Sequence, residues 1–274
     1  MNIGYVCTNY NNTAYTRDAV ASLWRSREHQ YQIVVVDNNS NEENIVALQQ
    51  LARDFQHVEL ILNKDNSGYF GGLNIGIRHL RSNHPELDFM VVGNNDLVCP
   101  GCFGESLQSN LSVLETHSVV SPNIVTLDGI HQNPHVISKI STFRELIYSM
   151  YYANYHLAIA IRHVAKATRS FTERPDANYH NIAGKIYQGY GACYILGPVF
   201  FRYFEELWAP TFLMHEEFFL SKQLSDKGLS VYYEPSIKVL HCRHGAMGAV
   251  PPRKAWEAAR AARKIYRRYV RLIG

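Results

Sequence analysis

A run of β-branched residues passes directly into a polar cluster at Ile33-Val34-Val35-Val36-Asp37-Asn38-Asn39-Ser40. A continuous apolar run of this kind is typical of a strand buried on both faces, in a parallel sheet covered by helices. Further apolar runs occupy residues 3–7, 58–62 and 89–92. Amphipathic helical stretches alternate with these runs, at 16–27, 40–54 and 71–81. The alternation predicts an α/β fold with a mostly parallel sheet flanked by helices.

Polar residues follow three of the predicted strands. They are Thr8-Asn9-Tyr10-Asn11, Asp37-Asn38-Asn39-Ser40 and Asn94-Asn95-Asp96. Asn and Asp are good turn formers, so a turn alone explains any one of these clusters. A ligand site explains three of them better, because ligands of open α/β sheets bind beyond the carboxyl ends of the strands.

The composition is that of an ordinary globular chain, with 274 residues, 46% hydrophobic and 19% charged. No run of eighteen apolar residues occurs, so the sequence predicts no transmembrane helix. The five cysteines are odd in number and scattered, which argues against a disulfide framework and for a reducing compartment. We therefore expect a cytoplasmic protein.

The C-terminal segment is strongly basic. Residues 253–274 hold eight Lys or Arg and one acid, a net charge of +7, so residues 1–252 sum to −4. A mildly acidic body argues against a nucleic-acid partner. One helical face of the segment carries Trp256, Ala259, Ala262, Tyr266, Tyr269 and Ile273. Such a helix suits contact with the inner face of the cell membrane. The alternative, a helix docked on the body with a solvated basic face, is equally consistent with the sequence.

Asp96 and His241 are candidate metal ligands. A lone carboxylate after a strand can simply cap the next turn, but Mg²⁺ or Mn²⁺ bound with a diphosphate needs only one or two protein carboxylates. His241 ends the last apolar run, and imidazole suits Mn²⁺ better than Mg²⁺. A half-buried histidine without a ligand role is the alternative.

Glu216 and Glu217 open a predicted helix at 216–227. Paired carboxylates at this position also complement the helix dipole. As a functional pair, one would accept the proton of an attacking hydroxyl, and the other would orient the acceptor or tune the pKa of its neighbour.

The glycine-dense segment 68–76 could cradle phosphate on backbone amides, or form a turn that allows close helix packing. It matches neither a dinucleotide-binding fingerprint nor a P-loop.

Taken in order, five segments resemble the inverting glycosyltransferase family 2, which has the GT-A fold. They are the opening strand and loop at 6–11, the second strand end at 34–40, the glycine-rich segment 63–76, Asn94-Asn95-Asp96 in the place of a D-x-D motif, and the base-bearing segment 212–220. Their continuation through 228–241 resembles members that build bacterial capsule and lipopolysaccharide chains.

The resemblance implies a metal-dependent hexosyltransferase with a nucleotide-diphosphate sugar as donor, Mn²⁺ or Mg²⁺ as cofactor and a lipid-linked cell-surface saccharide as acceptor. Asp96 and His241 would hold the metal, and Glu217 would be the base with Glu216 as its neighbour. The donor would be contacted by Thr8, Asn9, Tyr10, Asp37, Asn66, Gly68, Asn74, Asn95 and Asp96. Two features depart from the family pattern: Asn stands where Asp is common in the metal motif, and the base is Glu where Asp is usual.

The resemblance also implies a domain organisation. A GT-A domain spans 1–245, with a nucleotide-binding half at 1–125, a helical insertion at about 126–187 and an acceptor half at 188–245. A basic amphipathic helix follows at 246–274. Two other functions stay open. A sugar nucleotidyltransferase would need a loop rich in Gly, Arg and Lys after the first strand, which this chain lacks. A non-catalytic saccharide-binding relative would fit the Asn-for-Asp changes.

Overall fold

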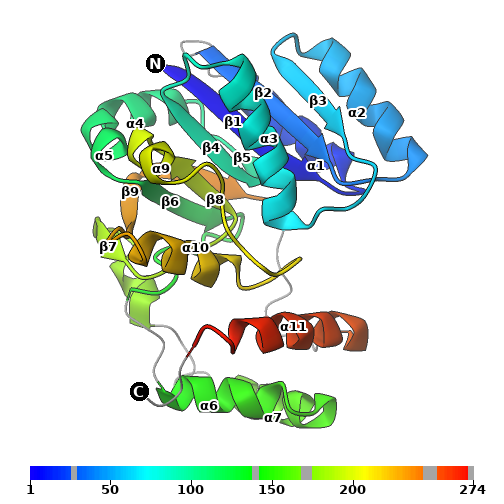
Figure 1. The fold of residues 1–274 in the computed structure, drawn as a ribbon, viewed down its shortest axis with the longest axis vertical. Helices are drawn as coiled ribbons and strands as arrows, with labels where there is room; N and C mark the ends of the chain where they lie inside the picture. Colours follow the sequence, from blue (N-terminus) through cyan, green and yellow to red (C-terminus); the bar gives the residue numbers. More distant parts are fainter. Residues whose placement is uncertain (26–29, 138–141, 168–174, 243–251, 271–274) are drawn as a thin grey trace.

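The computed structural model describes residues 1–25, 30–137, 142–167, 175–242 and 252–270. Within them, nine strands form one sheet in the order β3-β2-β1-β4-β8-β6-β9-β5, with β7 paired to β9 (Figure 1). The strands are β1 Asn2–Asn9, β2 Gln30–Asp37, β3 Val58–Leu62, β4 Phe89–Asn94, β5 Leu97–Val98, β6 Val119–Thr126, β7 Gly184–Ile186, β8 Cys193–Leu196 and β9 Val231–His241. The four strands from β3 to β4 are parallel, as the alternating pattern predicts.

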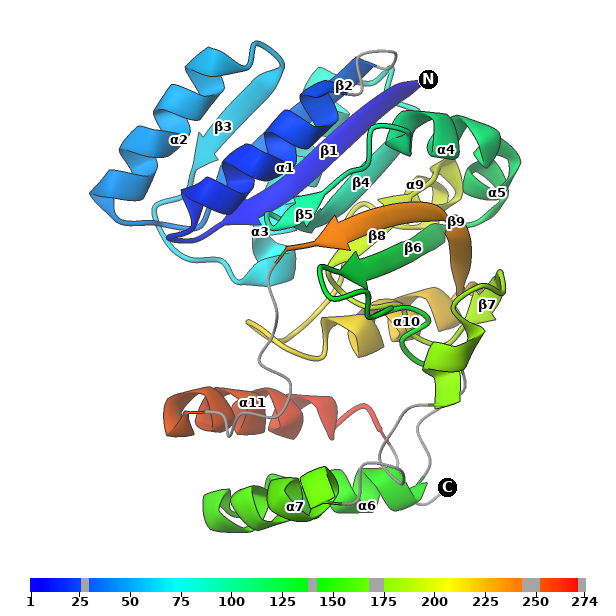
Figure 2. The ribbon, with the colours of Figure 1, turned by 180° about the vertical axis from the view of Figure 1, so that it is seen from behind.

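Helices cover both faces of this sheet, α1 and α2 on one and α3 on the other (Figures 1 and 2). The helices are α1 Thr13–Arg25, α2 Glu42–Asp54, α3 Tyr69–Asn83, α4 Phe103–Ser109, α5 Leu111–Thr116, α6 Thr142–Tyr151, α7 Tyr155–Ala167, the 3-10 helix η1 Pro175–Tyr179, α9 Pro198–Tyr203, α10 Glu216–Ser225 and α11 Arg253–Tyr266.

The two faces of the central strands are both apolar, which explains the continuous apolar runs. Ile33 and Val35 pack into one core cluster with residues of α1 and α2. Val34 and Val36 pack into the other, with residues of α3. Successive side chains of a strand point to opposite faces, so a strand covered on both sides needs an apolar residue at every position.

The three polar clusters meet at one edge of the sheet. In the parallel pairs, Asn9 lies opposite Asp37 on β2, and Thr8 lies opposite Asn94 on β4. The carboxyl ends of β1, β2 and β4 are therefore neighbours, as expected for a ligand-binding edge.

The second half of the sheet differs in detail from the sequence-based expectation. Within residues 188–197 the structure has the short strand β8, which runs antiparallel to both β4 and β6. The two apolar runs at 229–233 and 237–240 are joined in the single strand β9, whose register against β6 shifts between Pro122 and Asn123. Apolar runs identify strands, but a register irregularity has no signature in hydrophobicity.

A helical layer lies beyond the sheet at one end of the molecule, with α11 between the body and the α6–α7 pair (Figures 1 and 2). The apolar face of α11 is buried: Trp256 is 3% exposed and Tyr266 is 3% exposed. The Tyr266 ring contacts the rings of His215, at a centroid distance of 4.6 Å, and Phe218, at 4.5 Å. Of the two alternatives for the basic segment, the structure thus shows the docked helix.

This helix is shorter than predicted, since α11 ends at Tyr266, and Ile273 falls outside the described residues. None of the helices in the described part of the chain is both long and apolar enough to span a membrane.

Candidate active site

A cavity of about 210 Å³ opens at the carboxyl ends of the parallel strands. We call it the strand-end cavity, and its lining residues are Thr8, Asn9, Tyr10, Asn12, Asn38, Asn94, Asn95 and Asp96. Five of the predicted donor contacts lie here: Thr8, Asn9, Tyr10, Asn95 and Asp96. Tyr10 is 55% exposed, so its ring is open to a ligand at the rim.

Asn9 and Asn95 form the rigid floor of this cavity. The Asn95 side-chain amide donates to Asn9 Oδ1 at 3.2 Å, the Asn12 carbonyl at 3.2 Å and Thr16 Oγ1 at 2.8 Å. Asn9 in turn donates to Asp37 Oδ1 at 2.9 Å. The middle residue of the Asn94-Asn95-Asp96 segment is thus engaged in holding the loops together.

Asp37 lies behind the cavity wall and not on it. It is fully buried, at 0% exposure. Its Oδ1 accepts hydrogen bonds from Asn9 and, at 2.5 Å, from the Ser40 hydroxyl, while Oδ2 accepts from the Ser40 amide at 2.8 Å. A carboxylate engaged in this way organises the turn after β2, which differs from the expected direct contact with the nucleotide.

Asn74 and Asn66, two further predicted donor contacts, bond to the backbone outside the strand-end cavity. Asn74 is 8% exposed and pairs with the backbone of Leu207, donating to its carbonyl at 2.8 Å and accepting from its amide at 2.9 Å. Asn66 accepts from the Gly68 amide at 3.0 Å. Their amides therefore shape loops, and neither residue lines the strand-end cavity.

Gly68 lies in close contact with the segment that precedes Glu216 and Glu217. Its φ is +76°, and a Cβ at this position would lie 2.1 Å from the Phe212 carbonyl oxygen. The same oxygen accepts a hydrogen bond from the Tyr69 amide at 3.2 Å. An amide at the start of α3, one of those that could have cradled phosphate, thus bonds to the 209–215 segment.

Asp96 and His241 come together across the β5–β9 ladder, where His241 pairs with Leu97. Both residues are 6% exposed, and His241 Nε2 lies 3.2 Å from Asp96 Oδ1. The Nδ1 atom of His241 lies 2.7 Å from Gln132 Oε1, an acceptor, so in the neutral imidazole Nδ1 donates this hydrogen bond and Nε2 has its lone pair available for a metal.

Two buried acceptor atoms thus face each other, and Asp96 Oδ1 has no hydrogen-bond donor. With the neutral imidazole, a cation beside the pair would compensate the buried carboxylate, which is otherwise costly. The residues therefore fit a divalent metal held by one carboxylate and one imidazole, with the second nitrogen of the imidazole oriented by an amide oxygen. No group of three or more His, Cys, Asp or Glu suited to a metal occurs in the part of the chain described.

Glu216 and Glu217 begin α10 after an unusual turn. Met214 and His215 both have positive φ, at 74° and 66°, in the left-handed region that few residues other than glycine adopt. Backbone strain of this kind persists only where the surroundings enforce it, and it concentrates at functional sites. In this turn the Thr211 hydroxyl donates to the Met214 carbonyl at 2.8 Å.

Glu217 lines a second cavity of about 200 Å³, which we call the Glu217 cavity. Its walls include His135, Tyr148, Tyr152, Gln188, His215 and Arg263. Glu216 is 5% exposed, and its Oε1 has no hydrogen-bond donor. Burial, and then the nearby charge of Glu217, raises the pKa of Glu216 to about 7.

A short turn, residues 190–192, joins the two cavities. The Ala192 carbonyl accepts from the Asn94 amide at 2.9 Å, on the strand-end side. The Gly191 amide donates to Glu217 Oε1 at 3.3 Å, on the other side. The Tyr190 ring lies 6.1 Å from that of His241 and 5.4 Å from that of His135, which lines the Glu217 cavity.

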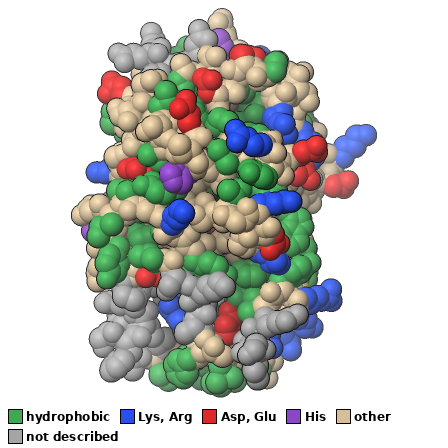
Figure 3. Space-filling view, turned by 60° about the vertical axis from the view of Figure 1, so that its left-hand side comes forward, with side chains coloured by type: hydrophobic (Ala, Val, Ile, Leu, Met, Phe, Trp, Pro, Cys, Tyr) green, Lys and Arg blue, Asp and Glu red, His purple; other side chains and the backbone are tan. Residues whose placement is uncertain are grey.

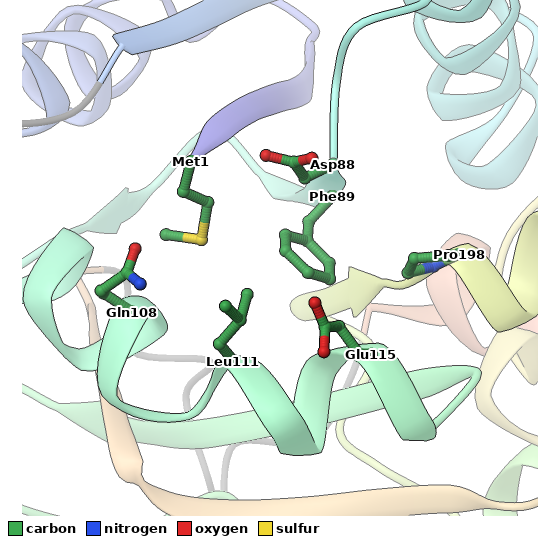
Figure 4. A pocket seen from close by; sticks show the side chains of 7 residues that line it. All are labelled: Met1, Asp88, Phe89, Gln108, Leu111, Glu115 and Pro198. Atoms are coloured by element: carbon green, nitrogen blue, oxygen red, sulfur yellow. The ribbon is translucent and has the colours of Figure 1, made fainter.

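Several residues of the site were not predicted. Asn38 and Asn94 belong to the polar clusters and Asn12 directly follows the first of them, so all three could have been included on position alone. Gln132, Tyr190, Gln188 and Arg263 had no such signal, since they lie in loops, the helical insertion and α11. A third cavity, of about 250 Å³, lies at the opposite strand ends, where Met1, Phe89, Leu111 and Glu115 turn toward one another (Figure 4). It is remote from all of these residues.

The family model described as Glycosyl transferase family 2 matches residues 6–174, more than half of the chain. The chain belongs to glycosyl transferase family 2. The match includes the strand-end cavity and Asp96, and it ends before Glu216 and His241.

A relative of this family 2 chain is TagX of Staphylococcus aureus (strain MRSA252), a protein that carries the name of a glycosyltransferase. The two are 28% identical over 103 residues, which are 37% of this chain and 28% of TagX. The chain therefore spans less than a third of that relative's length.

Two solved structures resemble the family 2 chain at low sequence identity. The mannosyltransferase PcManGT from Pyrobaculum calidifontis, in complex with GDP-Man and Mn²⁺, has a TM-score of 0.52 at 12% identity, over 95% of this chain and 60% of its own. GalNAc-T7 with UDP, GalNAc and Mn²⁺ has a TM-score of 0.55 at 13% identity, over 92% of this chain and 45% of its own. These similarities show the fold, which is the GT-A fold expected from the sequence.

Proposed function

We propose that this family 2 protein is an inverting, metal-dependent glycosyltransferase that moves a sugar from a nucleotide-diphosphate donor to an acceptor hydroxyl. The observation that carries the proposal is the shared turn at 190–192, which contacts Asn94 of the strand-end cavity through Ala192 and Glu217 through Gly191. A transferase of this kind needs a site for the leaving diphosphate and a base for the acceptor close to one reacting carbon.

Asp96 and His241 would hold the metal, and imidazole favours Mn²⁺ over Mg²⁺. Once bound, the ion would neutralise the charge that develops on the leaving diphosphate. One protein carboxylate is sufficient, because phosphate oxygens and water complete the coordination. The Mn²⁺ and the nucleotide or nucleotide sugar named for PcManGT and GalNAc-T7 support this assignment.

The strand-end cavity would bind the nucleotide, with the exposed Tyr10 ring stacking against the base and Thr8 and Asn12 offering polar contacts. Asn9, Asn95 and Asp37 would keep this surface in place. Rigid supports of this kind preserve the geometry that a bound donor requires.

Glu217 would accept the proton of the acceptor hydroxyl. Glu216, whose own pKa is raised, would tune the charge next to this base. Attack from the face opposite the leaving group inverts the anomeric configuration. Tyrosine, histidine and glutamine side chains in the Glu217 cavity suit a saccharide, which presents both apolar ring faces and hydroxyls. We propose a lipid-linked cell-surface saccharide, as in capsule or lipopolysaccharide assembly, as the acceptor.

Thermal unfolding with UDP, GDP, dTDP or CMP, each with and without Mn²⁺, tests the proposal. At least one nucleoside diphosphate should raise the Tm more with Mn²⁺ than without it. A ligand at a hundredfold excess over its Kd stabilises by about 2.7 kcal/mol. Asp96→Asn should remove the metal-dependent part of the shift, and Asp226→Asn, on the exposed end of α10, should retain it. A panel in which Mn²⁺ changes no nucleotide shift would refute the metal-dependent donor site.

A further inference from the structure

Helix α6 has its polar residues inside and its apolar residues outside. Glu145 is 3% exposed and pairs with Arg263 and Tyr266 of α11, and Ser149 accepts from Arg267 at 2.7 Å. The other side of the helix carries three exposed apolar side chains: Phe143 at 71%, Leu146 at 56% and Met150 at 44%. A helix on the surface of a soluble protein normally has the opposite arrangement.

Helix α7, which packs against α6, also carries exposed apolar side chains. Leu157 is 40% exposed and Val164 is 63% exposed, two helical turns apart on one side of α7. Helices α6 and α7 pack together at the end of the molecule farthest from β3 (Figures 1 and 2). Hydrophobic side chains gather at this end in the space-filling view (Figure 3). We call Phe143, Leu146, Met150, Leu157 and Val164 the hairpin face.

The helical layer around the hairpin face is strongly basic. Residues 142–167 and 253–270 contain ten Lys or Arg and two acids, a net charge of +8, so the rest of the chain sums to −5. Both acids are paired, Glu145 with Arg263 and Glu257 with Arg253 at 3.0 Å. The remaining cations therefore favour a partner of negative charge.

We infer that the hairpin face and its basic surroundings form a docking surface for an anionic lipid bilayer. A bilayer accepts exposed apolar side chains at its interface, and its acidic headgroups attract Lys and Arg nearby. A second copy of this chain would also cover these apolar side chains. It would, however, bring two helical layers of net charge +8 against each other, and their repulsion disfavours such a dimer. The surface does not depend on the proposed activity, although it would bring the Glu217 cavity, walled by Tyr148 and Arg263, close to the membrane.

Vesicle cosedimentation of the full chain tests the inference. Phosphatidylcholine vesicles containing phosphatidylglycerol should bind the protein at low salt, and pure phosphatidylcholine vesicles should bind it much more weakly. The double variant Phe143→Gln/Leu146→Gln should bind at least about tenfold more weakly, because two apolar side chains no longer enter the interface. Lys264→Gln/Arg268→Gln should also bind more weakly and depend less on salt.

Val46→Gln, at an exposed apolar position of α2 with 58% exposure, is the matched control and should bind like the wild type. All variants alter exposed side chains, so their Tm values should remain close to that of the wild type. Absence of binding to phosphatidylglycerol vesicles, or undiminished binding by Phe143→Gln/Leu146→Gln, would overturn the inference. So would a dimer in analytical ultracentrifugation that this double variant converts to a monomer, since a second copy would then cover the face.

Discussion

Glu217 is the residue on which the proposed chemistry depends. An amide cannot take up the hydroxyl proton, so Glu217→Gln should lower turnover by about 10²–10⁴-fold. Donor affinity should survive, because the strand-end cavity is on the far side of the 190–192 turn. Release of nucleoside diphosphate measures turnover, and calorimetric titration measures binding. Glu206→Gln, at an exposed carboxylate paired with Arg78, serves as the control. Wild-type turnover in folded Glu217→Gln would remove the base assignment.

Glu216 should make stability depend on pH. Its pKa is raised from 4.5 to about 7, so the folded state binds this proton more tightly than the unfolded chain does. The free energy of unfolding therefore falls as pH rises between these two values. Glu216→Gln removes the effect and should be more stable than the wild type by about 3 kcal/mol above pH 7, with little difference below pH 4.5. Urea unfolding of both proteins without added metal, at acidic and at slightly alkaline pH, measures this. Parallel pH profiles would contradict the prediction.

At the scale of elements, the contact between α6 and α11 depends on one buried ion pair. Glu145 is 3% exposed and Arg263 is 5% exposed. Glu145→Ala would leave the guanidinium buried without its partner, at a cost of about 3–5 kcal/mol in urea unfolding. The double variant Glu145→Leu/Arg263→Met should lose less than the single one, since no charge remains buried.

An exposed ion pair on α11 provides the comparison. Glu257 pairs with Arg253, and their side chains are 53% and 71% exposed. Glu257→Ala should change stability by less than about 1 kcal/mol, because water screens the pair. Equal losses at positions 145 and 257 would mean that the buried pair does not hold the helical layer.

The junction between α3 and the segment before α10 should be sensitive to a single methyl group. Gly68→Ala would place a Cβ 2.1 Å from the Phe212 oxygen, at a φ of +76° that alanine resists. The expected cost is at least about 1 kcal/mol, together with lower turnover as Glu217 shifts with the segment. Gly101→Ala is the control, since its added Cβ would have nothing within 4 Å. Wild-type stability and turnover in Gly68→Ala would show that this contact does not position α10.

At the scale of the whole molecule, the sheet and the helical layer should differ in dynamics. The parallel strands are buried on both faces, whereas among the described side chains of α6 and α7 just Glu145 and Ala158 are buried. Segments with few buried contacts open locally at low free energy. Hydrogen exchange followed by mass spectrometry should therefore show faster exchange in α6 and α7 than in β1 and β4. Equal protection would mean that the layer unfolds only with the sheet.

The net charge of the molecule is divided between the same two parts. The helical layer carries +8 and the remainder −5, and the two parts meet around the Glu217 cavity, where α11 supplies Arg263. The proposed acceptor side of the site is thus built partly by the basic layer, and the proposed donor side by the strand ends and the turns that follow them. A membrane-bound acceptor would then approach from the layer while a soluble donor enters at the strand ends.

The sequence by itself determined the α/β architecture, because a strand covered on both faces must be apolar at every position, and Ile33 through Val36 show this directly. It also located the polar strand ends, since parallel strands place their carboxyl ends at one edge. The pairing of Asp96 with His241 needed the β5–β9 ladder, which joins residues far apart in the chain. The roles of Asp37, Asn66 and Asn74 were equally undetermined by sequence, because an amide or carboxylate binds a ligand or a backbone with the same chemistry. Only the tertiary structure decides which partner lies within hydrogen-bond distance.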